Sequence, residues 1–178
     1  DNEIRTNIVN AITNKELSFL MEDMFLDDAV DFLEEVPANV VTRVLKATDA
    51  KTRETINRFL NYAEDTAGSI MTTEMVQLHT HLNASEAIDQ IRKTGIDKET
   101  IYTCYCIDEK RHLVGILDLK DLLLCEPNTK LTDIMDDDKQ IISVITSDDQ
   151  ETVADLARKY DLLSVPVTDN ENRLVGII

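Results

Sequence analysis

The sequence predicts an α+β protein in which an all-α, superhelical domain of helical repeats precedes a duplicated β-α-β-β-α unit. Two observations predict this fold class. Up to about residue 64, apolar residues recur at helical spacing in segments of 12 residues, and after residue 65 strand and helix patterns alternate and occur twice. We therefore expect a helical domain at 1–64 and two related α/β units at 65–130 and 131–178.

The helical domain is expected to consist of short helices separated by sharp corners. Its repeat aligns four residues at which the helices would break: Phe25, Pro37, Asp49 and Asn61. Thr13 and Glu16 have the spacing of a capping box and would begin one helix. A helix of about two turns cannot bury its own apolar face, so stacked repeats would form a small superhelix. An ordinary helical bundle without true repeats fits the same pattern.

The α/β part of the chain contains two copies of one pattern. Ile70-Met71 returns 64 residues later as Ile134-Met135, and the hairpin at 108–117 returns 61 residues later at 169–178, each with the motif Leu-Val-Gly-Ile. Asp and Asn favour the turn of each hairpin, and the residues after it alternate as a strand does. The first unit continues into a further helix, so the matching helix of the second unit is expected beyond residue 178.

The charge of the chain limits its partners. It carries 35 Asp and Glu against 18 Lys and Arg, a formal net charge of −17. Such a surface repels nucleic acid and anionic lipid, and no basic patch offsets it. The charge is −6 up to residue 64, where seven bases face thirteen acids, and −11 thereafter. Two acidic bodies repel each other, which makes a divalent cation the expected partner.

Few residues suit catalysis or zinc binding. The sequence has no Gly-rich phosphate loop and no nucleophile-elbow motif, so we do not expect an enzyme. His79 and His81 alternate as strand residues do, and so do Cys104 and Cys106. Either pair could hold zinc, but neither has zinc-site spacing to the other, and buried strand cysteines are favoured. Three cysteines and no apolar run long enough to span a bilayer favour a reducing, cytosolic location.

Paired carboxylates on one helix face are the main sign of a binding site. Asp27 and Asp31 are four residues apart, so their side chains stand one helical turn apart. Like charges at this spacing destabilise a helix, whereas clustered carboxylates suit hard cations such as Mg²⁺ or Ca²⁺. The alternative is that Asp27 or Asp28 favours the helix N-terminus and the other acids form a solvated face.

The junction between the two parts of the chain carries a family motif. Residues 62–72 read Tyr-Ala-Glu-Asp-Thr-Ala-Gly-Ser-Ile-Met-Thr. With the helical repeats before it and the duplicated Leu-Val-Gly-Ile unit after it, this run resembles the cytosolic region of MgtE-type magnesium channels, which contains a tandem CBS pair. The resemblance implies a homodimer formed through the CBS pairs, on the cytoplasmic side of the membrane. It also implies Mg²⁺ sensing that gates a membrane pore beyond residue 178.

The resemblance also implies metal ligands. Matched motif by motif, they are the carboxylates or backbone carbonyls of six residues: Asp27, Asp31, Ser69, Glu151, Arg158 and Asp161. The first two carboxylates and the carbonyl of Ser69 would form one site. The carboxylates of Glu151 and Asp161 and the carbonyl of Arg158 would form a second, local site only if the end of their helix curls back.

A nucleotide site is the other possibility that a CBS pair implies. The family pattern places a hydroxyl and then an Asp after the hairpin glycine, for phosphate and ribose. Asp121 matches the ribose ligand, whereas Asp118 replaces the hydroxyl and would repel phosphate, which Lys120 would partly offset. The alternative role of Asp118 is to cap the helix that follows. Binding of ATP or AMP stays open, and the competing function is a nucleotide-sensing CBS module of an enzyme or another transporter.

Overall fold

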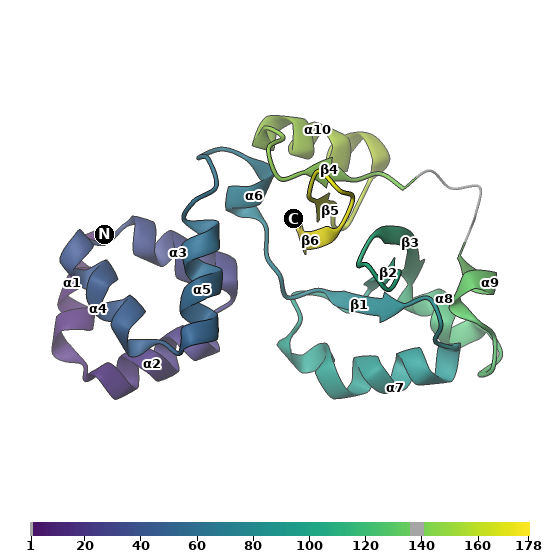
Figure 1. The fold of residues 1–178 in the computed structure, drawn as a ribbon, viewed down its shortest axis with the longest axis horizontal. Helices are drawn as coiled ribbons and strands as arrows, with labels where there is room; N and C mark the ends of the chain where they lie inside the picture. The colour runs from purple at the N-terminus through teal and green to yellow at the C-terminus, as the bar shows by residue number, and fades with distance from the viewer. Residues whose placement is uncertain (1, 136–140) are drawn as a thin grey trace. The chain divides into compact units, whose positions relative to one another are not determined.

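The chain folds as two compact units, Asp1–Ala63 and Glu64–Ile178. The computed structural model describes residues 2–135 and 141–178 (Figure 1). The division lies one residue before the predicted end of the helical domain. The predicted fold class is confirmed, because among the described residues the first unit contains helices and no strand, and the second unit contains two small sheets flanked by helices.

Short helices of regular spacing build the first unit. They are α1 (Asn2–Ala11), α2 (Asn14–Asp23), α3 (Leu26–Glu34), α4 (Ala38–Ala47) and α5 (Ala50–Phe59). Each helix begins 12 residues after the one before it, which confirms the predicted repeat. Phe25, Pro37 and Asp49 are the N-caps of α3, α4 and α5. Helix α2 packs against α4 and α3 against α5, so alternate helices bury their apolar faces together.

Polar groups close the ends of these helices. The Thr13 hydroxyl accepts from the Glu16 N–H at 3.3 Å, and the Thr13 N–H donates to Glu16 Oε2 at 2.8 Å, which confirms the predicted capping box. Arg43 of α4 donates to the carbonyl oxygens of Val9 and Ile12 and, at 3.0 Å, to Asn14 Oδ1. Since the last carbonyls of a helix lack partners within it, Arg43 satisfies the end of α1 and links it to α4.

Asp49 caps the start of α5 and gives the first unit a pH dependence. Its Oδ1 accepts from the N–H groups of Lys51 and Thr52 at 2.8 and 3.1 Å. Hydrogen bonds from the Thr52 hydroxyl and N–H hold the pKa of Asp49 below its ordinary value. A carboxyl with a depressed pKa stabilises the fold above its unfolded pKa of about 4 and loses this contribution as the pH falls through the folded pKa.

We expect wild type to lose more stability than Asp49→Asn between about pH 6 and about pH 3. Asparagine still caps the helix but does not titrate, so the comparison removes the pH dependence and keeps the cap. Urea unfolding followed by circular dichroism at both pH values measures the difference. An equal loss in the two proteins would show that the Asp49 carboxylate is not the titrating group.

The described residues of the second unit form two three-stranded sheets of the same topology. The strands are β1 (Val76–His79), β2 (Thr103–Ile107), β3 (Leu113–Asp118), β4 (Val144–Ile145), β5 (Pro166–Thr168) and β6 (Leu174–Ile177). In each sheet the first strand is parallel to the second, and the third returns antiparallel as a hairpin. The helices are α6 (Ala67–Ile70), α7 (Ala84–Thr94), the 3₁₀ helix η1 (Gly95–Asp97), α8 (Leu119–Leu124), α9 (Leu131–Ile134) and α10 (Gln150–Tyr160). This arrangement confirms the prediction that the β-α-β-β pattern occurs twice.

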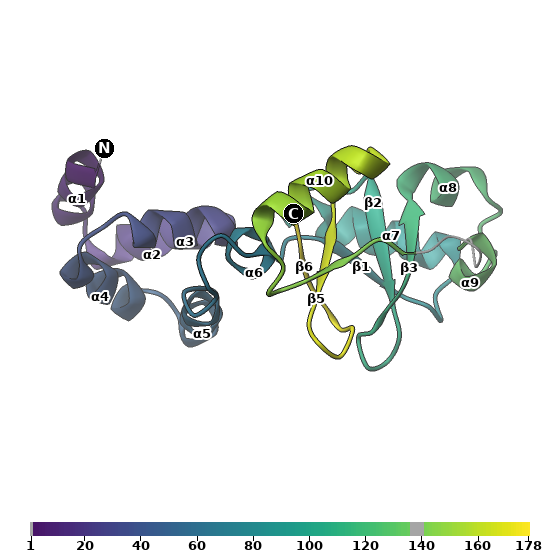
Figure 2. The same ribbon diagram turned by 90° about the horizontal axis from the view of Figure 1, so that it is seen from above.

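The two hairpins meet next to their turns, and Figure 2 shows them side by side. The Leu113 N–H donates to the Asn172 carbonyl, and the Leu174 N–H donates to the Arg111 carbonyl, both at 3.0 Å. Arg111 and Asn172 occupy equivalent turn positions, and both have positive φ, 69° and 60°. The repeated sequence thus produces an internal near-symmetry in which equivalent backbone groups exchange hydrogen bonds.

We call the two copies of the repeat, 65–130 and 131–178, the first and second motifs. Each motif begins with a short helix, and this helix packs on the other motif. Helix α6 lies beside α10 (Figure 1), and its Gly68 N–H donates to the Thr146 carbonyl at 2.9 Å. Helix α9 reaches back to the first motif, where Leu131 is fully buried among its core residues and donates its N–H to the Leu82 carbonyl at 3.1 Å. The same exchange brings Met71 onto Gly176 and Met135 onto Gly115.

Alternation along β2 separates two cores. Cys104 and Cys106 face the apolar core formed with α7 and α8, whereas Tyr105 and Ile107 face a second core shared with β6. Burial raises the pKa of both thiols to about 12. They are therefore protonated at neutral pH and poorly reactive, which confirms the interpretation of these residues as buried strand cysteines.

Candidate functional site

A cavity of about 770 Å³ lies within the second unit, between its two motifs. Its lining residues are Thr103, Val114, Gly115, Ile116, Asp118, Asp121, Met135, Ile141, Ile142, Asp161, Leu162, Leu163, Ser164 and Pro166. A volume of this size suits a small organic ligand. Both motifs contribute to the walls, so a bound ligand would contact both copies of the repeat.

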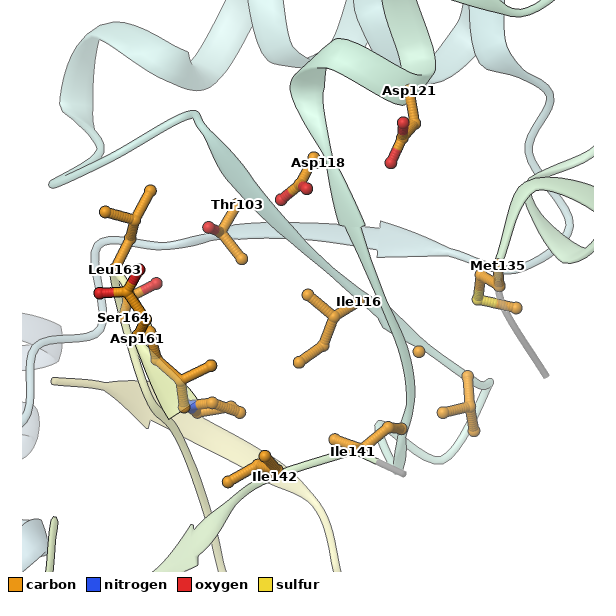
Figure 3. A pocket seen from close by; sticks show the side chains of 14 residues that line it. Thr103, Ile116, Asp118, Asp121, Met135, Ile141, Ile142, Asp161, Leu163 and Ser164 are labelled. Carbon is orange, nitrogen blue, oxygen red and sulfur yellow. The ribbon is translucent and has the colours of Figure 1, made fainter. Parts of the chain in front are cut away.

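Carboxylates dominate the polar part of this cavity. Figure 3 shows Asp118 and Asp121 on the side of β3 and α8, and Asp161 on the opposite side near Ser164. Thr103 contributes a hydroxyl beside Asp118, and isoleucines form an apolar wall. Among the described residues that line the cavity there is no Lys or Arg. The site therefore favours a cation, or an anion that arrives with one.

Local backbone structure holds these polar groups in place. Asp118 ends β3 and is the N-cap residue of α8, but its side chain makes no capping hydrogen bond to the described residues. Its carboxylate thus stays at the cavity, contrary to the alternative of a helix-capping role. Asp161 is the C-cap of α10 in the left-handed region, with φ of 51°. Ser164 is fixed by a 2.6 Å hydrogen bond with the buried Tyr105 hydroxyl.

The structure separates the two residues predicted for nucleotide binding. Asp121 lines the cavity, but Lys120 lines a neighbouring depression of about 440 Å³ whose wall is mostly apolar. The sequence interpretation did not include Thr103 or Ser164. Both come from positions that no motif marks, and only the pairing of distant segments brings them to one cavity.

The predicted metal ligands at the start of the chain lie on two units. Asp27 and Asp31 are on α3, where Asp31 is exposed and Asp27 half-buried. Their neighbours Leu26 and Val30 face the core, so the two carboxylates form one polar edge of the helix. Ser69 lies in α6 of the second unit, where its hydroxyl donates to the Thr66 carbonyl at 2.9 Å.

The predicted ligands on α10 are not brought together. Glu151 lies in its first turn and Asp161 directly after its last, so ten residues separate them, about 15 Å along the axis. The end of α10 does not curl back toward Glu151. Glu151 and Asp161 of one chain therefore do not form the single local site that required this. Asp161 joins the cavity, whereas Arg158 is exposed and pairs with Asp155 at 2.9 Å.

Comparisons with known proteins agree with this architecture. The family model of the MgtE intracellular N domain matches residues 1–65, and that of the CBS domain matches residues 67–128 and 131–178. The magnesium transporter MgtE of Thermus thermophilus is 39% identical over 157 residues, covering 86% of this chain and 34% of that protein. The Bacillus subtilis MgtE is 32% identical over 178 residues, covering 100% of this chain and 39% of that protein. The chain thus spans little more than a third of these curated relatives.

Two solved structures match the whole chain. The crystal structure of the soluble part of a magnesium transporter has a TM-score of 0.95 and 34% identity, and covers 100% of this chain and 69% of that one. The cytosolic domain of the Mg²⁺ channel MgtE in complex with ATP has a TM-score of 0.92 and 35% identity, and covers 100% and 72%. Among the described residues, no helix is both long and apolar enough to span a bilayer. The chain belongs to the MgtE magnesium transporter family and comprises its intracellular N domain and CBS domains.

Proposed function

We propose that this chain is the Mg²⁺-sensing regulatory region of a magnesium channel, on the cytoplasmic side of the membrane, and that it gates a pore elsewhere in the protein. The observation that carries the proposal is the excess of acid in both units within a formal net charge of −17. At low Mg²⁺ the acidic units repel each other and the pore opens. At high Mg²⁺ the ions screen and bridge them, and the pore closes.

The carboxylate edge of α3 is the principal metal site in this proposal. Asp27 and Asp31 supply carboxylates, and the carbonyl of Ser69 completes the site when the units close. Because a hard cation keeps many of its waters, carboxylates on a partly exposed helix edge bind it loosely, with dissociation constants of about 10⁻⁴–10⁻³ M. Glu151 and Asp161 lie at opposite ends of α10. We therefore assign their two carboxylates to different ions, and keep the carbonyl of Arg158 as a further metal ligand.

An apolar surface on the second unit supports homodimer formation. Tyr102, Leu123, Leu124 and Leu163 are 68%, 60%, 74% and 85% exposed and line the depression of about 440 Å³ beside α8. Large apolar side chains gathered on one surface mark an interface. We therefore place the CBS-to-CBS contact of the dimer there.

Addition of Mg²⁺ is expected to compact the protein and protect the 60–66 segment from proteolysis, with a midpoint near millimolar. Small-angle scattering measures the compaction, and its forward intensity distinguishes a dimer from the 20.2 kDa monomer. In the double variant Asp27→Asn, Asp31→Asn the midpoint should rise about tenfold.

The control removes the same charge from the same unit. Glu22→Gln with Glu54→Gln changes two exposed acids on α2 and α5, and should shift the midpoint far less. Equal shifts in the two double variants would exclude a site at Asp27 and Asp31. A scattering profile unchanged up to several millimolar Mg²⁺ would exclude sensing by this region altogether.

ATP binding in the cavity is a second candidate function. A related cytosolic domain has been solved in complex with ATP, and the cavity volume here suits a nucleotide. Asp121 would hold the ribose hydroxyls and the isoleucine wall the adenine. Asp118 and Asp161 oppose the phosphates, so we propose that the nucleotide binds as its Mg²⁺ complex.

A further inference from the structure

We propose that the first CBS motif carries a binding site for a transition-metal dication of the Zn²⁺ class, formed by His79, His81 and Glu109. These side chains each offer one ligand atom, and the three atoms lie within 4.8 Å of one another. The site differs in place and in chemistry from the acidic Mg²⁺ sites proposed above, and it does not depend on them.

Strand topology brings the three residues to one edge of the sheet. Strands β1 and β2 are parallel, and His79 pairs in register with Ile107. Both strands end at this edge, so the residues that follow them meet there. The Thr80 N–H donates to the Ile107 carbonyl at 3.2 Å, which holds the ends of strands β1 and β2 together.

The side chains already lie close to a ligating arrangement. The rings of His79 and His81 are stacked, with centroids 5.5 Å apart and planes at 21°. His81 Nδ1 is 3.2 Å from Glu109 Oε1. Ligand atoms around tetrahedral zinc stand about 3.3 Å apart, given Zn–N distances of about 2.0–2.1 Å. The side chains of His81 and Glu109 are 62% and 81% exposed, so they can rotate by the small amount required.

Within the described part of the chain, no hydrogen bond at Nδ1 of His79 competes with a metal. Its Nδ1 is buried and has no hydrogen-bond partner among the described residues. By contrast, His112, in the turn between β2 and β3, has its Nδ1 2.8 Å from Asp108 Oδ2. Since none of the residues that the structure describes bonds Nδ1 and fixes the tautomer of His79, the ring can present a lone pair to a metal.

The donor set selects the class of metal. Two imidazoles and one carboxylate, with water in a fourth position, match zinc coordination, whereas Mg²⁺ prefers oxygen ligands throughout. Imidazole also suits Cu²⁺ and Ni²⁺, so the site is selective for this group against Mg²⁺ rather than for one ion. A bound ion would fasten the 108–112 turn to the end of β1 and stabilise the first motif.

Zn²⁺ titration in the presence of millimolar Mg²⁺ tests the site. The wild-type chain should bind one Zn²⁺ by calorimetry, and Co²⁺ should give the visible absorption of a four-coordinate ion. His81→Gln and Glu109→Gln should each weaken Zn²⁺ binding at least tenfold. Both side chains are mostly exposed, so these variants are expected to fold as wild type does, which circular dichroism checks.

His112→Gln is the matched control, because it removes a nearby histidine, in the turn that carries Glu109, and leaves the three ligands intact. It should bind Zn²⁺ as wild type does. Absence of binding, undiminished binding in His81→Gln, or an equal loss in His112→Gln would each overturn the proposal. Since Mg²⁺ is present throughout, these outcomes leave the test of Mg²⁺ sensing unaffected.

Discussion

Gly176→Ala is expected to destabilise the second unit by about 2–3 kcal/mol. A Cβ at this position would lie 2.6 Å from Met71 Sδ and 2.7 Å from the carbonyl oxygen of Thr72. The methionine side chain can rotate, but the backbone of Thr72 cannot withdraw, because it exchanges hydrogen bonds of 2.8 and 2.9 Å with Ile177. Relief of the clash would break this pairing of the two motifs. Chemical unfolding monitored by a probe in the second unit measures the loss.

The repeat provides an internal control for this substitution. Gly115 occupies the same place in the first Leu-Val-Gly-Ile motif. The atoms that a Cβ there would approach too closely both belong to a side chain, Met135 Sδ at 2.2 Å and Cγ at 3.0 Å. A flexible methionine can move, so Gly115→Ala should cost only about 1 kcal/mol. A loss as large as that in Gly176→Ala would mean that methionine packing, rather than the backbone approach, requires glycine.

Asp118→Ser is expected to strengthen ATP binding about tenfold in the presence of Mg²⁺. Two unit charges about 5 Å apart interact by about 3 kcal/mol at an effective dielectric constant of about 20, and the exposure of Asp118 reduces this. Removal of one carboxylate from a cavity with three therefore leaves a gain of about 1.4 kcal/mol, which is tenfold in affinity. Serine also provides a hydroxyl donor for phosphate. Calorimetric titration with ATP measures the change.

The matching control is Asp97→Ser, which removes an exposed aspartate of η1 outside the cavity. It changes the net charge equally and should leave the affinity for ATP within about twofold. The same gain in both variants would assign the effect to net charge. No gain in Asp118→Ser would exclude phosphate binding near Asp118.

Local patterns in the sequence predicted most of the fold. In the helical unit, each repeat makes its own helix and its own corner, so Pro37 or Asp49 marks a boundary without reference to the rest of the chain. The duplicated hairpins were equally legible, because turn chemistry and strand alternation extend over about ten residues.

Features that depend on pairing between the motifs could not be predicted. Helices α6 and α9 each pack on the other motif, and this leaves no trace in the hydrophobic periodicity of the sequence. The cavity combines Thr103, Asp118 and Ser164, which come from segments that share no sequence pattern. The family resemblance implies one site for Glu151 and Asp161 only if the end of their helix curls back. That condition depends on the length of α10, which places the two residues at opposite ends.

Helix α6 begins the first motif in the sequence but packs on the second motif, so sequence order does not show which motif the helical unit is linked to. The segment that leaves the helical unit leads into α6. Just before this helix the Asp65 carbonyl accepts from the Gln150 N–H at 2.8 Å, and at its start the Ala67 N–H donates to the Asp148 carbonyl at 2.7 Å. A tether that precedes the first motif is thus anchored to the second. A movement of the second motif would therefore reach this tether through its hydrogen bonds with Asp65 and Ala67, and not through the first motif.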